Sequence, residues 1–293
     1  MPKEYSRLLL LFLAICLSAC QHKTKTVSFY YWRTTYAPDS TEIDALKTNK
    51  VHTLYVRYFD VDWSDSDAAP TPLSPIRFDT LPTGYAVVPV IFFYNRVFER
   101  LDSAPSHALA EKVLALVRRI DVPAHLNPAE TQFDCDWTER SRDNYFRFIR
   151  QYHALSGLTL SSTIRLHQIK YSDRTGIPPV DHGILLFYNM GNIDAGTGNS
   201  IYDRAVAHRY TPSLRNYPLL LDLALPIFPM NIQTQDGKTK TQHPTADDLL
   251  DMVDDVNRHS NQKIRDLIFF DLDRQNLVQY DKGLFEEVLE RTE

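Results

Sequence analysis

Two aspartates spaced two residues apart are the clearest chemical signal in this chain. Asp134 and Asp136 lie within residues 131–139, whose sequence is TQFDCDWTE. Successive side chains of a strand point to opposite faces, so both carboxylates share one face with Gln132, and the apolar side chains alternate with them. If helices cover the apolar face, the carboxylates point into an interior, where they are costly unless they are paired or used. The pattern predicts a catalytic or ligand-binding strand.

The rest of the chain predicts the scaffold that positions this strand. Apolar runs mark eight strands, near residues 27, 51, 86, 130, 158, 183, 218 and 266, and most are separated by helical patterns. This alternation predicts an α/β fold, a single (β/α)8 TIM barrel with some irregular or missing helices. A doubly wound open sheet is the alternative, but no glycine-rich phosphate motif follows the first strand. The proline-rich stretch 64–84 is predicted to be a long loop with a short extended piece at 76–78.

In a TIM barrel the active site lies at the carboxyl ends of the strands, so polar residues that end the predicted strands become candidates. The candidates are Arg57, Asp60, Asp62, Asp134, Asp136, Arg165, Tyr188, Asn189, Asp271 and Asp273. Asp222 falls inside the seventh strand and is either an acid in the lumen or a sign that the register there is wrong.

The fourth and sixth strands carry a family resemblance. Asp134-x-Asp136-Trp137, together with Phe187-Tyr188-Asn189-Met190, resembles the chitinase-like glycoside hydrolases, which are TIM barrels with a D-x-x-D-x-D-x-E strand and a Met-Tyr strand. Most of the chain from the first strand onward is also similar to a group of bacterial envelope lipoproteins that share this barrel, including residues 55–61 (YVRYFDV) and 89–93 (PVIFF).

The resemblance implies acid/base chemistry on a glycan, and one departure from the motif leaves its assignment open. The enzymes place their proton-donating Glu where this chain has Thr138, and Glu139 comes one residue later. One register makes Glu139 the donor if a helical start turns it inward. The preferred register makes Asp136 the donor, with its pKa raised by burial, and Asp134 its partner beside Arg57 or Arg165.

The remaining candidates have roles that follow from the same resemblance. Tyr188 is expected to orient the sugar or stabilise developing charge, and Asn189 to hydrogen-bond a hydroxyl. Substrate contacts are expected from Arg57, Asp60, Arg165 and Asp271. The alternative is a barrel that binds a glycan or a protein without catalysis, in which ion pairs with arginine hold the acids.

Composition and motifs exclude several other classes. The net charge of −5 includes no basic block, which argues against nucleic acid as a partner. No cofactor or metal is expected, because the histidines lack metal spacing and the acids after the second and eighth strands have the positions of turn and capping residues. The expected partner is a glycan or another envelope polymer.

The first twenty residues predict a membrane anchor. Lys3 and Arg7 precede the apolar run 8–17, and Leu17-Ser18-Ala19-Cys20 resembles a bacterial lipobox. We therefore expect a signal peptide at 1–19, a lipidated Cys20 with a tether at 20–26, and a barrel domain at 27–293. The chain is expected at the bacterial cell envelope, facing the periplasm or the cell surface. Cys135, the cysteine that remains, is expected to be a core residue.

Overall fold

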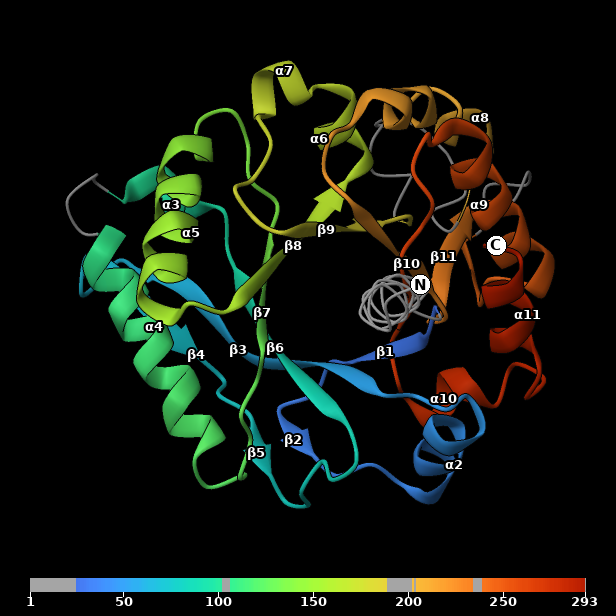
Figure 1. Cartoon of the computed structure of the whole chain (residues 1–293), viewed down its shortest axis with the longest axis horizontal. Coiled ribbons are helices and arrows are strands. Elements are labelled where there is room, and N and C mark those ends of the chain that lie inside the picture. The colour runs from blue at the N-terminus through green and yellow to red at the C-terminus, as the bar shows by residue number, and fades with distance from the viewer. Residues whose placement is uncertain (1–24, 102–105, 189–201, 203, 234–238, 293) are drawn as a thin grey trace, which may run out of the picture.

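Eight parallel strands close into a ring in the computed structural model, which describes residues 25–101, 106–188, 202, 204–233 and 239–292 (Figure 1). Around the ring each strand pairs with its neighbours in chain order, and β1 pairs with both β3 and β13 to close it. The strands are β1 (Val27–Tyr31), β3 (Thr53–Ser64), β6 (Ala86–Phe93), β7 (Glu130–Cys135), β8 (Thr159–Arg165), β9 (His182–Leu186), β10 (Leu221–Pro226) and β13 (Leu267–Phe270). The predicted TIM barrel is confirmed.

Helices surround the ring and supply the outer core (Figure 1). They are α2 (Ser40–Thr48), α3 (Arg96–Arg100), α4 (Ser106–Asp121), α5 (Arg142–Ser156), α6 (Leu166–Lys170), α7 (Ser172–Thr175), α8 (Arg204–Ala207), the 3₁₀ helix η2 (Thr211–Asn216), α9 (Ala246–His259), α10 (Arg274–Leu277) and α11 (Leu284–Glu290). Several helices are a single turn, as the irregular helical pattern predicted. Cys135 is buried in this outer core with Phe133 and Trp137, as expected.

The lumen of the barrel has a core of its own. Tyr30, Tyr55, Val90 and Ile184 belong to an inner apolar cluster that is separate from the outer one. Polar residues occupy the two ends of the lumen: Asp134 and Arg165 lie near the carboxyl ends of the strands, and His182 and Asp222 near the amino ends. The apolar cluster therefore separates two polar groups.

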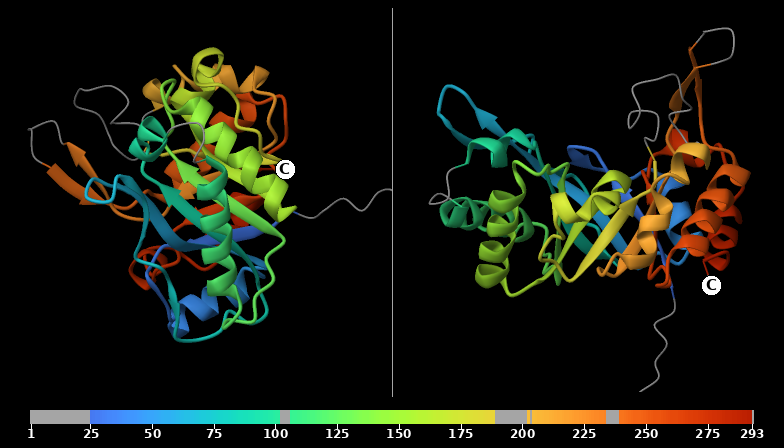
Figure 2. Two further views of the ribbon diagram at one scale, coloured as in Figure 1. Left: turned by 90° about the vertical axis from the view of Figure 1, so that its left-hand side faces the viewer. Right: turned by 90° about the horizontal axis from the view of Figure 1, so that it is seen from above.

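The connection after β3 differs from the prediction. The stretch predicted as a loop contains β4 (Ala69–Leu73), which pairs antiparallel with β3 and was not predicted. β5 (Arg77–Phe78), which pairs with β2 (Thr35–Tyr36), lies on the short extended piece that the sequence predicted. Prolines hid β4 in the sequence, because an edge strand tolerates prolines that a central strand does not. The hairpin that β3 forms with β4 and the hairpin that β11 (Met230–Gln233) forms with β12 (Thr239–Gln242) project from the same end of the barrel (Figure 2).

The seventh barrel strand starts later than predicted. Residues 211–216 form η2, so β10 begins at Leu221 rather than near Tyr217. Asp222 pairs in register with Ile184 of the inner cluster and is buried, which identifies it as a lumen acid. No helix in the described part of the chain is long and apolar enough to cross a membrane.

Candidate functional site

Strand β7 presents Asp134 to the upper lumen. The side chain is 8% exposed and accepts a hydrogen bond of 2.7 Å from the Thr163 hydroxyl of β8. Burial raises the pKa of Asp134 to about 6, the nearby charge of Arg165 opposes the shift, and the charge of Asp136 adds to it. Asp134 is thus a buried acid that gains a proton at mildly acidic pH.

Asp136, one pleat further along, lies at the rim of the barrel and is paired with a cation. Arg165 at the end of β8 donates from Nε to Asp136 Oδ1 at 2.6 Å and from Nη2 to Oδ2 at 3.4 Å. The Asp136 side chain is 53% exposed and that of Arg165 is 20% exposed. The prediction that burial falls on Asp136 is wrong: β7 ends at Cys135, so Asp136 reaches solvent and Asp134 is the buried acid.

Arg165 connects the two acids with Tyr188. Its guanidinium carbon lies 5.9 Å from the Tyr188 ring centroid. Burial opposes the positive charge of Arg165, but Asp136 and Asp134 outweigh this effect and raise its pKa above the usual range. Burial also raises the pKa of Tyr188, which keeps this phenol neutral at ordinary pH. The acids, Arg165 and Tyr188 are therefore one electrostatically coupled group.

Aromatic rings lie beside this polar group. Tyr188 contacts Phe228 and Phe270 at centroid distances of 5.7 and 6.1 Å, and Trp32 contacts Phe270 at 5.2 Å. Phe92, which is paired in register with Asp134, contacts the exposed ring of Tyr94 at 5.0 Å. Flat apolar faces next to fixed polar groups suit a sugar ring, which has both kinds of surface.

Asp271 adds a third acid from the end of β13. It accepts a hydrogen bond of 2.8 Å from Asn276 Nδ2, and burial together with the charge of Asp273 raises its pKa to about 6. Its charge acts on Tyr188, so it belongs to the same end of the lumen. Asn189, the predicted ligand of a sugar hydroxyl, lies outside the described residues, as does Cys20.

Arg57 and Asp60 are held by each other. Arg57 Nε and Nη2 donate to the two Asp60 oxygens at 2.8 and 2.6 Å, and both side chains are largely buried. A bulge in β3 after Arg57 allows this pairing, because the extra residue turns Asp60 to the same face. Arg57 is therefore committed to Asp60, and Arg165 is the cation that acts on Asp134.

Glu139 does not join the group at the barrel mouth. It forms an exposed ion pair of 2.9 Å with Arg174 of α7, on the outer layer of the molecule. The register that makes Glu139 an inward donor is therefore wrong. The other predicted turn acids are also engaged: Asp62 pairs with Arg96, and Asp273 caps α10. Within the described ranges no group of three or more His, Cys, Asp or Glu is arranged to hold a metal ion.

A second polar cluster, at the amino-terminal end of the lumen, was not singled out in the sequence. His182 Nε2 lies 3.2 Å from Asp222 Oδ2 and 3.3 Å from Glu130 Oε1, and His182 is 2% exposed. Arg265 Nε lies 3.5 Å from Asp222 Oδ1. Burial raises the pKa of Asp222 to about 6, against the nearby charges of His182 and Arg265. We call these four residues the floor cluster.

The period-two pattern could have found two of the missed contacts. Thr163 shares a strand face with Arg165, and Glu130 shares one with Asp134, so each was within reach of the same argument. The aromatic neighbours Phe228 and Phe270 had no such signal, because they come from connections whose path is set by the tertiary fold.

Fold and site together define a (β/α)8 barrel with an acidic, arginine-bridged mouth. Three similar solved structures are the spore cortex-lytic enzyme SleL of Bacillus cereus, a GH18 chitinase of Cycas revoluta in complex with (GlcNAc)4, and the chitinase RmChi1 of Rhizomucor miehei. Each has a TM-score of 0.56, with identities of 12%, 11% and 9%. The matches cover 92%, 91% and 90% of this chain and 74%, 99% and 100% of those chains.

These identities establish the fold alone. The chain has the fold of the chitinase-like glycoside hydrolase barrels, as its two strand motifs predicted. No protein-family model and no curated protein matches the sequence.

Proposed function

We propose that this barrel binds a glycan at its mouth and acts on it by acid/base chemistry of Asp134 and Asp136. The observation that carries the proposal is a pair of acids on one strand in opposite environments, one buried with a raised pKa and one exposed beside Arg165. Glycosidases assign the roles of acid and base to two carboxyl groups by placing them in environments that give them different pKa values. The fold of the structural neighbours is consistent with this use.

The two acids have different tasks in the proposal. Asp136 reaches solvent and is the residue that meets the ligand, while Asp134 lies behind it and takes up a proton as the pH falls toward 6. When a sugar covers the mouth, Asp136 lies against the glycosidic oxygen and serves as the proton donor. Its proton goes to the oxygen of the leaving sugar as the glycosidic bond breaks, a water molecule bonds to the anomeric carbon, and the proton that this water loses returns to the carboxylate. Tyr188 and Arg165 orient the hydroxyl groups and stabilise developing charge.

The alternative is a barrel that binds a glycan or a protein without turning it over. Two observations favour it: the Arg165 ion pair stabilises Asp136 as an anion, and Thr138 stands where the chitinase-like pattern has its donor Glu. In this alternative the aromatic rings and Arg165 provide the binding energy and the acids fix the position of Arg165.

One experiment separates the two. The mature chain, with Asp136→Asn and Asp134→Asn variants, is incubated with chitin-like, peptidoglycan-like and mixed polysaccharides, and new reducing ends and bound protein are both measured. The proposal expects turnover by the parent and a loss of about 10²–10⁴-fold in Asp136→Asn with binding retained. Glu139→Gln is the matched control and keeps full activity. Binding without turnover by the parent supports the non-catalytic alternative.

The cellular setting is part of the same proposal. Cleavage before Cys20 and acylation of its thiol anchor the chain in the bacterial cell envelope, with the mouth directed away from the membrane because the tether leads into the amino end of β1. The motif at residues 17–20 supports it. Metabolic labelling with a palmitate analogue tests it: the parent incorporates label, and Cys20→Ser does not.

A further inference from the structure

The amino-terminal end of the barrel exposes large apolar side chains. Val122, Leu220 and Leu81 are 73%, 49% and 45% exposed. They lie in the segments that lead into β7, β10 and β6, so the parallel direction of the strands brings all three to the end opposite the mouth. Single exposed apolar residues are common, but three of the four most exposed large apolar side chains in the described residues lie at this end, which marks it as a candidate contact surface.

Basic side chains surround these apolar ones. Arg118 and Arg119 end α4, and Lys47 and Lys50 lie at and just after the end of α2, all four exposed. Arg118 and Arg119 form no ion pair with a carboxylate in the described ranges. The helix dipole favours cations at the carboxyl end of a helix, and this effect is enough to explain the basic residues. It does not explain why Val122 is left exposed beside two arginines.

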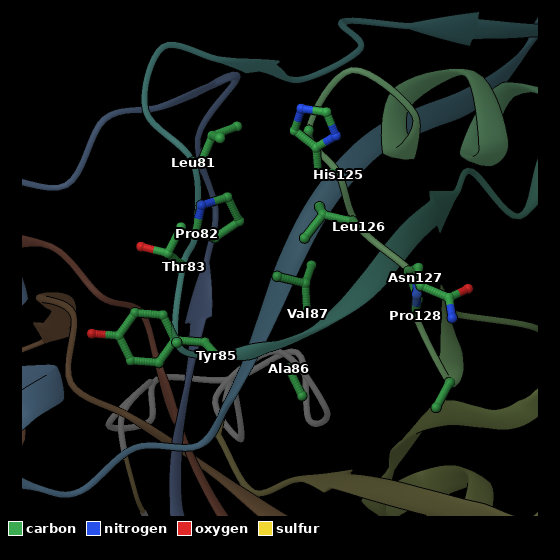
Figure 3. Close-up of a pocket in the computed structure, with 13 residues that line it drawn as sticks. Leu81, Pro82, Thr83, Tyr85, Ala86, Val87, His125, Leu126, Asn127 and Pro128 are labelled. Carbon is green, nitrogen blue, oxygen red and sulfur yellow. The ribbon is translucent and has the colours of Figure 1, made fainter.

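A pocket opens between two of these segments. Its volume is about 400 Å³, and its walls come from residues 81–87 before and within β6 and residues 124–129 before β7. Leu81 and Pro82 lie on one side, and His125 and Leu126 on the other (Figure 3). Apolar atoms make up the larger part of its lining, which suits an apolar group better than a charged metabolite.

The chain that precedes the barrel arrives at this same end. The residues between Cys20 and β1 reach at most about 20 Å even when fully extended. If Cys20 carries a lipid, as proposed above, the amino-terminal end is held within that distance of the bilayer surface. A basic and apolar surface at this distance is complementary to anionic headgroups and the acyl boundary beneath them.

We infer that this end of the barrel docks on an anionic lipid surface when the chain is anchored. The docking face consists of Lys47, Lys50, Leu81, Arg118, Arg119, Val122 and Leu220. The inference rests on the proposed anchor, but it concerns the orientation of the barrel and not its activity on a glycan. Docking fixes the mouth away from the membrane instead of leaving the barrel to rotate on a flexible tether.

The test makes the anchor chemically, so that it does not depend on acylation in the cell. The mature chain is coupled through Cys20 to a maleimide lipid in vesicles of phosphatidylcholine and phosphatidylglycerol; Cys135 is buried and does not compete. A water-soluble acetylating reagent then labels lysines, which mass spectrometry quantifies. We expect Lys47 and Lys50 to react at least about fivefold more slowly than in a chain capped with N-ethylmaleimide.

Lys240 of β12, exposed at the other end of the barrel, is the internal reference and keeps its rate. The inference would be overturned if Lys47 and Lys50 reacted at the same rate in the lipid-coupled chain and the capped chain, or if only Lys240 reacted more slowly in the coupled chain. Both results leave the glycan proposal and the acylation of Cys20 untouched, because neither enters the assay.

A variant and a change of conditions identify the contacts. Arg118→Glu with Arg119→Glu should reduce the slowing of Lys47 and Lys50 to less than about twofold, whereas Lys112→Glu, a single charge reversal in the middle of α4, should preserve it. Arg118→Glu alone, which matches Lys112→Glu in charge, should reduce the slowing part of the way. Raising the salt concentration to about 0.5 M should have the same effect on the lipid-coupled parent chain as the double variant has, and it requires no change of sequence. Slowing that survives both treatments contradicts docking on anionic lipid.

Discussion

The two ends of the lumen contain the same kinds of groups in different surroundings. At the mouth, Asp134 lies near Asp136 and Arg165; at the floor, Asp222 lies near His182, Glu130 and Arg265. Burial raises the pKa of both Asp134 and Asp222 to about 6. A raised pKa therefore does not by itself distinguish a site that can act on a ligand from one that holds the barrel together.

Exposure of the neighbouring groups makes the distinction. Asp136 is 53% exposed and lies beside aromatic rings, whereas His182 and Asp222 are 2% and 1% exposed. A ligand can reach Asp136 in the first cluster, whereas His182 and Asp222 at the centre of the second are sealed and only its outer members, Glu130 and Arg265, meet solvent. The mouth is thus a candidate site, and the floor cluster connects β7, β9 and β10 from inside.

The largest predicted effect is at the floor. Asp222→Ala removes the buried carboxylate that faces His182 and Arg265 and leaves the backbone N–H of Asp266 without its acceptor, and we expect it to lower the free energy of unfolding by about 3–5 kcal/mol. The matched change at the mouth, Asp136→Ala, removes a half-exposed partner and should cost about 1 kcal/mol or less. Urea unfolding measures both. Similar losses in the two variants would contradict the contrast between the two ends.

The second effect has the opposite sign. The pKa of Asp134 is about 6 in the folded chain and about 3.9 in an unfolded one, so its stabilising contribution is full below pH 4 and is lost as the pH rises through 6. Asp134→Asn does not titrate, and we expect it to be more stable than the parent by about 2 kcal/mol at pH 7. At pH 3.5 the difference should vanish. Unfolding at both pH values checks this.

If Asp134→Asn is more stable than the parent and has lost turnover of the glycan, Asp134 is retained for function rather than for stability. A variant that is less stable than the parent at pH 7 would mean that the charged form of Asp134 contributes to the fold.

The third prediction concerns Arg165. Its charge lowers the pKa of Asp134, so Arg165→Gln should move that pKa further above 6, with a loss of stability of about 1 kcal/mol. Carbon-13 NMR titration of the aspartate carboxyls measures the shift. Arg96→Gln, which removes the partner of Asp62, is the control and should leave Asp134 unchanged. An unchanged titration in Arg165→Gln would show that the two groups are not coupled.

The smallest effect is expected outside the barrel. Glu139 and Arg174 are both more than half exposed, so Glu139→Gln should change the free energy of unfolding by less than about 0.5 kcal/mol. Glycan binding and turnover should also be unchanged. A loss of turnover comparable with that of Asp136→Asn would return Glu139 to the site and contradict the geometry at the end of β7.

Much of this arrangement could be read from residue types and their period. The strand pattern predicted eight barrel strands, and alternation placed Asp134 on the lumen face of β7. It also predicted a lumen position for Asp136, which the structure instead places at the rim, just past the end of the strand. The same rule failed at β3, where the bulge after Arg57 shifts the alternation and brings Asp60 beside it. Such a bulge depends on the pairing partner and leaves no mark in the local pattern.

The sequence alone determined the class of fold and which faces of the strands are polar, because side-chain period follows from backbone geometry and is a local property. Only the tertiary structure decided how the charges are shared: that Arg165 pairs with Asp136, that Arg57 pairs with Asp60, that Glu139 faces α7, and that His182 meets Asp222. Pairing and burial depend on distances between strands far apart in the chain, and these distances exist only once the ring has closed.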